Sequence, residues 1–439
     1  MNVQISSRRQ FLRTIALAGF GLAAAACVPV PEISTDSAAA GEEPVGLSLW
    51  GWWDTRMAHY RSVADQFAKQ SGRITVDVDS TAGGYPERIY SSLAAGAGPN
   101  MLKMPDLLTM HQMREENLLL QFPEDIFPLN WFRVAYPFFD TETNGRYVLP
   151  TGSSCTLLMY NKRMFAEAGL DPESPPTTWS DFTTAAKALT RKDASGAIAH
   201  AGLALTLDWP VLNQIYQLGG NVIHNSGDEQ TSLMTSPEVH EAFTYIADLA
   251  RTHEVWHPSL PDHEAVGKGR AAMTEEQAWA INEFAYTYPD IYPDIGYSHP
   301  PTPTGAPDPL FGYKDIVTSI SALTGRPQNN AETWQFMEYL YKDGGKEAYR
   351  DLCLLSALAP ERADLMSDPL LMESPGLSKA AEVNPRERSY GAVPYRASAV
   401  LHDVLHLIVS EGRSVTQALD YGETEIQKII NEGLAKYWV

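Results

Sequence analysis

Aromatic side chains stand at the ends of predicted strands and at the starts of predicted helices, where they could cover a sugar ring. A flat indole or phenol suits the apolar C–H face of such a ring, whose hydroxyl groups then need polar partners. Core packing is the alternative for each residue, because aromatic side chains dominate cores as well. We expect several of them to line one cleft. The aromatic candidates are Trp52, Trp53, Tyr85, Trp209, Trp279, Tyr313 and Tyr395.

Polar side chains near the same positions could bind the hydroxyl groups of a ligand. Carboxylates accept hydrogen bonds from hydroxyl groups strongly, and Arg396 would suit an anionic or strongly polar ligand. The alternative for each is an exposed surface charge, which is the usual place of Asp and Glu. The polar candidates are Asp54, Glu87, His111, Ser153, Asp208, Glu275, Glu276 and Arg396, with Gly312 beside Tyr313.

Motifs of hydrolases, metal centres and nucleotide sites are missing from the sequence. The 11 histidines are spread out, and neither H-E-x-x-H, a Cys–His cluster nor G-x-S-x-G occurs. Glu275 and Glu276 suggest an acid/base pair, but adjacent residues on a helix do not face each other. Gly267 and Gly269 lack the third glycine of a dinucleotide fingerprint. We therefore predict no catalytic residue, metal or cofactor.

The N-terminus has the pattern of an export signal. Residues 7–13 read SRRQFLR, which matches a twin-arginine motif except for the final Arg. The apolar stretch 15–26 is too short for a comfortable membrane span, and Ala-Ala-Ala-Cys27 looks like a lipobox whose cysteine is lipidated. A plain alanine-rich signal with a chance cysteine is the alternative. Residues 28–44 are rich in Pro, Ala, Ser and Glu, which predicts a flexible tether.

The length and the net charge of the chain limit its fold class and the kinds of partner that it can bind. A chain of 439 residues is too long for one hydrophobic core, so two lobes are expected. Its formal net charge of −21 repels nucleic acid and anionic lipid. Three cysteines are too few for a disulfide framework. Cys155 and Cys353 could pair, but each lies inside a predicted apolar element, which favours two buried thiols.

Strands and helices are predicted to alternate along the chain, which indicates an α/β fold with a parallel sheet and right-handed crossovers. Ligands of such sheets bind beyond the carboxyl ends of the strands. Strands are predicted at 45–50, 73–79, 105–108, 155–159, 198–206 and 315–322. Helices are predicted between 54 and 72, at 85–97 and 162–168, from 178 to 189, from 208 to 218, and at 238–250, 331–342, 346–355, 397–410 and 415–431.

The stretch from Arg146 to Thr190 carries a long motif. It contains Met159-Tyr160-Asn161-Lys162, Phe165, Ala168-Gly169-Leu170, Pro175-Pro176, Thr178-Trp179 and Asp181-Phe182. This order resembles the run Y-Y-N-K-x-x-F-x-x-A-G-L-x-P-P-x-T-W-x-E-F of sugar-type extracellular solute-binding proteins of ABC importers, the relatives of maltose-binding protein. Met159 for an aromatic and Asp181 for Glu are mild departures. The motif is a folding signature, so Trp179 is expected to be structural.

Three shorter stretches resemble other motifs of the same family. Residues 144–150 are similar to its G-K-x-Y-G-L-P hairpin, and Pro105-Asp106-Leu107 to its P-D-V strand. Residues 267–273 are similar to its G-K-A-A-M strand, with Trp279 on the short helix that follows.

The resemblance implies a two-lobed periplasmic-binding-protein-like fold with an interlobe cleft and three hinge crossings. The first crossing is expected near 151–154, the second just before the strand 315–322, and the last near 357–362. The implied boundaries are a signal peptide at 1–26, a tether at 27–44, an N-terminal lobe at 45–152 and 315–358, and a C-terminal lobe at 153–314 and 359–439.

The resemblance also implies a function. It suggests a monomeric receptor, lipid-anchored at Cys27 outside the cytoplasm, that closes on a carbohydrate or related solute and delivers it unchanged to the transmembrane permease. An exported lipoprotein enzyme acting on polysaccharide or peptide is the alternative, and a sensory binding protein is a third possibility. Neither the identity of the ligand nor that of the permease follows from the sequence.

Overall fold

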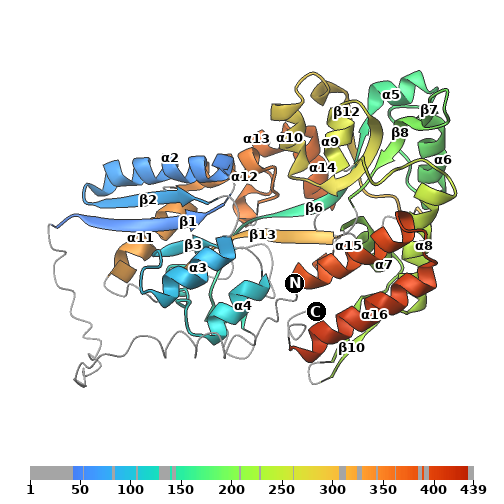
Figure 1. The fold of residues 1–439 in the computed structure, drawn as a ribbon. Coiled ribbons are helices and arrows are strands. Elements are labelled where there is room, and N and C mark those ends of the chain that lie inside the picture. The colour runs from blue at the N-terminus through green and yellow to red at the C-terminus, as the bar shows by residue number, and fades with distance from the viewer. Residues whose placement is uncertain are drawn as a thin grey trace. The chain divides into compact units, whose positions relative to one another are not determined.

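A computed structural model describes most of the chain (Figure 1). The described residues are 43–52, 54–81, 85–104, 107–127, 139–140, 145–206, 209–226, 229–260, 262–305, 313–323, 329–342, 345–360, 362–383, 388–389 and 395–433. The elements below all belong to one unit, Pro44–Val439. The predicted signal peptide, Cys27 and most of the tether lie outside the described residues.

The first elements follow the predicted strand–helix–strand order. Strands β1 (Val45–Gly51) and β2 (Ile74–Ser80) pair in parallel, and α2 (Asp54–Ser71) packs on them (Figure 1). Gly72 has a φ of 71°, a conformation that glycine adopts at little cost, and it ends the helix. The predicted apolar stripe of α2 is buried at Met57, Tyr60, Val63 and Phe67.

The third strand lies earlier than predicted. Strand β3 is Met101–Lys103, and it pairs with β1 on one side and β13 on the other. The predicted strand at 105–108 is wrong at residues 107 and 108, which already belong to α4 (Leu107–Glu115), and residues 105 and 106 lie outside the described residues. Met110 and Met113 of α4 are buried at helical spacing in one cluster with Leu102. The sheet takes up Met101 and Leu102, so the apolar residues after Pro105 pack as a helix.

Strand β6 (Leu149–Asn161) is the longest strand of the sheet and connects its two parts. Its first half pairs with β13 (Tyr313–Ala322), from Leu149↔Ile320 to Cys155↔Lys314. Its second half pairs with β11 (Ala271–Gln277) on one edge and β12 (Ile295–Ser298) on the other. The strand order is β2-β1-β3-β13-β6-β11-β8-β7. Figure 1 shows β13 and β6 near the middle of the sheet.

The sheet is mixed, which corrects the prediction of a parallel one. Parallel pairing holds for β1 with β2 and β3, and for β8 with β11. Strand β13 is antiparallel to both β3 and β6. Strands β11 and β12 also pair antiparallel with β6, so the mixed character extends over both edges of β6.

The motif between residues 146 and 190 folds as predicted. The Asn161 side chain accepts a hydrogen bond from Met164 N and caps α5 (Lys162–Glu167). The Thr178 side chain accepts one from Asp181 N and caps α6 (Trp179–Leu189), whose apolar stripe is buried. Trp179 stacks on Tyr245 with ring centroids 4.1 Å apart, and its Nε1 donates to Gln217 Oε1. Trp179 is therefore structural, as expected.

Most of the other predicted elements are also present. A hairpin was expected within residues 144–150, but the observed antiparallel pair joins β4 (Phe139–Asp140), which precedes that stretch, to β5 (Gly145–Arg146). The short helices α13 and α14 were not predicted. The other strands are β7 (Arg191–Lys192), β8 (Ile198–Ala204), β9 (Ile223–Asn225), β10 (Gln230–Ser232) and β14 (Arg388–Ser389). The other helices are α3 (Tyr85–Ala94), α7 (Trp209–Gln217), α8 (Pro237–Arg251), α9 (Asp262–Gly267), α10 (Ala280–Thr287), η2 (Tyr292–Asp294), α11 (Asn330–Tyr341), α12 (Lys346–Ser356), η5 (Ala363–Leu365), α13 (Pro369–Met372), α14 (Pro375–Val383), α15 (Tyr395–Val409) and α16 (Val415–Asn431).

Segments far apart in sequence complete each half of the core. Helices α11 and α12 return to pack against α2, where Phe336 meets Phe67 with ring centroids 5.3 Å apart. Helices α15 and α16 lie side by side and pack against α8 (Figure 1). Cys155 and Cys353 are both buried, and neither is joined in a disulfide, as the sequence favoured. Among the described helices, none combines the length and apolar character that crossing a bilayer demands.

Candidate functional site

Buried polar side chains on β6, α7 and β11 form a connected network, here named the polar cluster: Thr156, Asn213, Gln214, Glu275 and Gln277. Gln214 Nε2 donates to Glu275 Oε2 at 3.1 Å. Gln277 Nε2 donates to Thr156 Oγ1 at 3.1 Å, and Thr156 Oγ1 donates to Asn213 Oδ1 at 3.3 Å. Each of the five is at most 5% exposed. Burying this many polar groups is costly, so the network points to a function other than packing.

Strand geometry places the members of the polar cluster on one face. Glu275 lies opposite Leu158, and Gln277 lies opposite Thr156, in the antiparallel pairing of β11 with β6. Because successive side chains of a strand point to opposite faces, Glu275 and Gln277 share a face, and Glu276 lies on the other. The prediction treated Glu275 and Glu276 as helical, which is wrong. They nevertheless form no acid/base pair, since they point to opposite faces of the strand.

Glu275 is the buried acid of the polar cluster. Burial raises its pKa to about 7, and hydrogen bonds from Gln214 and Asn213 oppose that rise. The carbonyl oxygen of Gln214, Oε1, is buried and accepts no hydrogen bond from the described residues. The polar cluster thus contains a hydrogen-bond acceptor without a donor, Gln214 Oε1, next to the carboxyl group of Glu275. A hydroxyl group of a ligand can donate the missing hydrogen bond.

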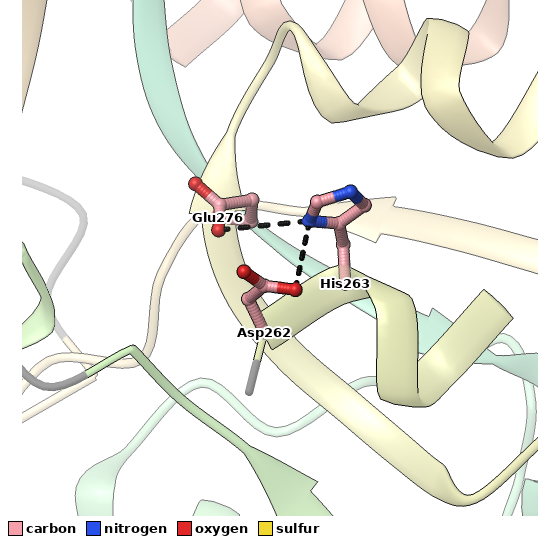
Figure 2. Close-up of side chains that lie close together, drawn as sticks. All are labelled: Asp262, His263 and Glu276. Atoms are coloured by element: carbon pink, nitrogen blue, oxygen red, sulfur yellow. Dashed lines mark ion pairs between the residues drawn. The ribbon is translucent and has the colours of Figure 1, made fainter. Parts of the chain in front are cut away.

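Trp279 precedes α10 and packs edge-on against His263, with ring centroids 4.9 Å apart and an interplanar angle of 83°. It is partly buried and follows Gln277 of the polar cluster by two residues. Two acids face the same nitrogen of His263, as Figure 2 shows: its Nδ1 is 3.1 Å from Asp262 Oδ1 and 4.0 Å from Glu276 Oε2. Burial lowers the pKa of His263, but Asp262 and Glu276 outweigh it, and the net pKa is raised.

Trp52 follows β1, but a cation already covers its ring. Lys103 Nζ lies 3.6 Å from the ring centroid, and the Lys103 side chain is 1% exposed. That face of Trp52 is engaged in a cation–π contact and is not open to a sugar. The sequence reasoning missed Lys103, whose only signal was a lysine within the apolar run Met101–Met104. His111 lies partly buried on α4.

Ser153 marks a contact between two of the predicted crossings. Its N–H donates to Ala359 O at 3.0 Å, and the Ala359 N–H donates to Ser153 O at 2.8 Å. A Cβ on Gly152 would lie 2.8 Å from Leu358 Cβ, so the two segments pack closely. The predicted first and last crossings thus lie side by side, and their role as hinges stays a prediction.

The structure does not bring all candidates together. The Arg396 side chain is 54% exposed and forms an ion pair with Glu432 after α16. Only the backbone positions of six further candidates are described. Asp54, Tyr85 and Trp209 begin α2, α3 and α7, Glu87 lies in α3, and Tyr313 begins β13. Tyr395 begins α15 in the same way. Trp53, Asp208, Gly312 and Cys27 lie outside the described residues.

Two cavities in the described part of the chain lie away from these candidates. One of about 410 Å³ is lined by Lys192, Trp256 and Arg270 among others. Another of about 570 Å³ lies at Trp179, Pro237 and Tyr245. Neither cavity is lined by a member of the polar cluster or by Trp279. The polar cluster is the candidate site because it joins a buried acid to several buried amides.

Comparisons with known proteins agree with the fold. A family model described as bacterial extracellular solute-binding protein matches residues 52–347. The chain is 29% identical over 176 residues to the sn-glycerol-3-phosphate-binding periplasmic protein UgpB of Pectobacterium atrosepticum, covering 36% of this chain and 38% of that protein. It is 25% identical over 230 residues to UgpB of Brucella abortus, covering 48% and 52%. The chain thus spans about half or less of these two relatives.

Solved structures match over a greater length. The cyclic α-maltosyl-1,6-maltose binding protein of Arthrobacter globiformis matches with a TM-score of 0.71 and 18% identity, covering 89% of this chain and 100% of that one. Maltose-bound MalE3 of T. maritima matches with a TM-score of 0.72 and 18% identity, covering 88% and 100%. These likenesses show that the chain has the two-lobed periplasmic-binding-protein-like α/β fold that the sequence predicted.

Proposed function

The chain belongs to the bacterial extracellular solute-binding protein family, and from this premise we propose that it is the receptor of an ABC importer for a carbohydrate or related polyhydroxylated solute. The observation that carries the proposal is the family match over residues 52–347. The fold supports it, because the matching structures include proteins whose names describe sugar binding. The receptor releases its solute unchanged to the transmembrane subunits of the importer.

The polar cluster supports a ligand rich in hydroxyl groups. Glu275 and the side-chain amides of Asn213, Gln214 and Gln277 offer both donors and acceptors within one buried network. Hydroxyl groups serve as both, so they can satisfy such a mixed set. Trp279 supplies an aromatic surface near Gln277 for the apolar face of a sugar ring. Ligand contact at these residues is part of the proposal.

An uncharged solute fits this site better than a phosphate ester. The side chain predicted to suit an anion, Arg396, is exposed and paired with Glu432. The described cluster contains the acid Glu275 and no basic side chain. A carboxylate close to a phosphate would repel it. We therefore propose a neutral saccharide or polyol, even though the UgpB relatives are named for sn-glycerol 3-phosphate.

Capture proceeds by closure of two lobes around the solute in this proposal, with the crossings near Ser153 and Ala359 as hinge segments. The chain is exported by the twin-arginine route, is anchored through a lipid on Cys27, and acts as a monomer. Replacing Cys27 by Ala should release the protein from the membrane fraction, whereas replacing Arg8 and Arg9 by Lys should hold it in the cytoplasm. Membrane retention of the Cys27→Ala protein would contradict the anchor.

A panel of ligands tests the function directly. Maltose, mannobiose, tagatose and sn-glycerol 3-phosphate are added to purified protein and the melting temperature is followed. A ligand at 100 times its Kd stabilises the native state by about 2.7 kcal/mol, which raises the melting temperature. A rise with a neutral sugar supports the proposal. A rise in melting temperature with sn-glycerol 3-phosphate alone would support the proposal of a receptor but refute the proposal of a neutral ligand.

Variants of the polar cluster then locate the site. Glu275→Gln and Trp279→Ala should each weaken binding of the active sugar at least tenfold in calorimetric titrations. Glu241→Gln, an exposed acid on α8, is the matched control and should bind normally. Glu275→Gln should fold at least as stably as the wild type, because the cost of a buried carboxylate is removed. Equal affinity of all three variants for the sugar would show that the binding site lies elsewhere.

Incubation with oligosaccharides tests the enzyme alternative. A receptor leaves each oligosaccharide intact, so chromatography after a long incubation should show the starting material only. New products that form with wild-type protein would overturn the proposal that the chain is no enzyme.

A further inference from the structure

Three side chains from α9 and β11 converge on one point and form a group that we name the acid–imidazole cluster: Asp262, His263 and Glu276. We propose that this cluster binds one divalent first-row transition metal ion and thereby fastens α9 to β11. One ligand atom from each residue lies within 4.8 Å of the other two. Figure 2 shows both carboxylates facing Nδ1 of His263.

The imidazole of His263 is buried, but its Nδ1 lacks a well-aligned hydrogen-bond partner within the described residues. The His263 side chain is 8% exposed, and the Glu276 side chain is 5% exposed. Although Asp262 Oδ1 is 3.1 Å from His263 Nδ1, Nδ1 makes no hydrogen bond of good geometry within the described residues. Buried nitrogen atoms without partners are rare in native proteins, and a metal ion between the three side chains would supply one here.

The charge of the cluster favours a divalent cation. With a neutral imidazole, the two carboxylates place two negative charges in a largely buried space. Glu283 on α10 adds a third negative charge nearby, while Lys268, a base whose charge acts on Asp262, forms an ion pair with Glu264. A dication would neutralise Asp262 and Glu276 and accept the lone pair of His263 at the same time.

The donor set selects the class of metal. Mg²⁺ and Ca²⁺ take oxygen ligands, so an imidazole nitrogen argues against them. One nitrogen and two carboxylate oxygens suit Zn²⁺ and its neighbours in the first transition row. Tetrahedral Zn²⁺ with ligand bonds of about 2.0–2.1 Å holds its ligands roughly 3.3 Å apart. His263 Nδ1 and Asp262 Oδ1 already have this spacing, and Glu276 Oε2 must come closer to His263 Nδ1 by less than an ångström.

The cluster could not be found by a sequence motif. His263 and Glu276 come from a helix and a strand separated by a turn, and the spacing of the three residues matches no common metal signature. The prediction that the chain binds no metal rested on such signatures alone. The proposed ion also lies next to Trp279, whose ring packs against His263.

Zinc titration of chelator-treated protein tests the proposal. His402 and His406 form an exposed stacked pair on α15 that could bind metal adventitiously, so all variants carry His402→Ala and His406→Ala. In this background, calorimetry should give one equivalent of bound Zn²⁺. His263→Gln should abolish this binding, and Glu276→Gln should weaken it at least tenfold. His240→Gln, an exposed histidine on α8, is the matched control and should bind one equivalent.

Three results would overturn the proposal. They are the lack of saturable 1:1 binding in the background protein, unchanged binding after His263→Gln, and displacement of Zn²⁺ by equimolar Mg²⁺. Circular dichroism verifies that each variant is folded. If His263→Gln is unfolded, Glu276→Gln and Asp262→Asn decide the question, since both keep the shape of the side chain, and full affinity in both refutes the site.

Binding of Co²⁺ can be followed by spectroscopy, and no spectral change is expected if the three side chains form ion pairs only and bind no metal. Co²⁺ bound at the cluster should produce a visible absorption band and quench tryptophan fluorescence, because Trp279 packs on His263. Trp279→Phe should remove that quenching while Co²⁺ still binds with one equivalent. Quenching that persists unchanged in Trp279→Phe would place the ion elsewhere and refute the assignment.

Discussion

Gly202 of β8 sits directly beneath helix α6, and replacing it with Ala should destabilise the protein. A Cβ built on Gly202 would lie 2.0 Å from Ala186 O and 2.6 Å from the Ala186 carbonyl carbon. These atoms belong to the helix backbone, so no side chain can rotate away. An ordinary carbon–oxygen contact requires α6 to retreat by about 1 Å or more.

The cost can be estimated from the contacts that would be disturbed. Overpacking of a well-packed interior costs about 1–3 kcal/mol. The Gly202 N–H also donates to Thr190 Oγ1, which in turn donates to Ala186 O, and loss of one such bond costs about 1 kcal/mol. Alanine regains about 0.5–1 kcal/mol in backbone entropy. The expected net loss in the free energy of unfolding is about 2–3 kcal/mol.

Urea unfolding of Gly202→Ala beside Gly46→Ala provides the assay. Gly46 is also a strand glycine, on β1, but a Cβ there would meet no atom within 4 Å. Gly46→Ala should be neutral or slightly stabilising, whereas Gly202→Ala should lower the urea midpoint clearly. Its melting temperature should fall by roughly 2–4 °C, since unfolding entropy is about 2.1 cal/mol/K per residue. Equal stability of the two variants would refute the reasoning about the close approach.

Three further predictions follow from the described contacts. Burial lowers the pKa of His59, whose Nε2 donates to Ala348 O at 2.9 Å, so the unfolded chain binds the proton more readily. The free energy of unfolding should then fall as the pH drops below 6.5, by at most about 1.4 kcal/mol per pH unit from this group. The stability of His59→Gln relative to the wild type should therefore be greater at pH 5 than at pH 7.5, and the same difference in stability at both pH values would contradict this. Cys155 and Cys353 are each 0% exposed, so a thiol reagent should label neither in the native protein and both after denaturation, and rapid native labelling would show that they are accessible. Trp179→Phe should cost about 1–2 kcal/mol in thermal unfolding, because it removes the bond to Gln217 and reduces the stack on Tyr245, while an unchanged melting temperature would show that Trp179 is not structural.

Local signals explain why much of the fold could be predicted. The caps at Asn161 and Thr178 involve residues three apart, so the sequence alone contains both partners. The apolar stripe of α2 likewise follows from spacing within one helix. The third strand was predicted too late because residues 105–107 resemble the family's P-D-V strand, whereas Lys103 interrupts the apolar run of β3. The contact of Lys103 with Trp52, which is distant in sequence, helps to explain how a lysine is buried there.

The candidate site could be predicted only in part. Glu275 and Trp279 were candidates because they follow an apolar strand, and the structure places them on or just after β11. Asn213, Gln214 and Thr156 gave no signal, since amides on a helix and a threonine in a strand are ordinary surface residues in sequence. Their burial depends on pairings between β6, β11 and α7, which join segments far apart in the chain.

The place of β13 in the sheet has a consequence for synthesis on the ribosome. β13 covers the edge of β3, yet it is translated only after every element from α4 to β12. The edge of β3 therefore stays open on the nascent chain for much of translation, as a template for mispairing with other chains. Shielding by chaperones should matter most in that interval, and a chain truncated before β13 should aggregate rather than yield a soluble half.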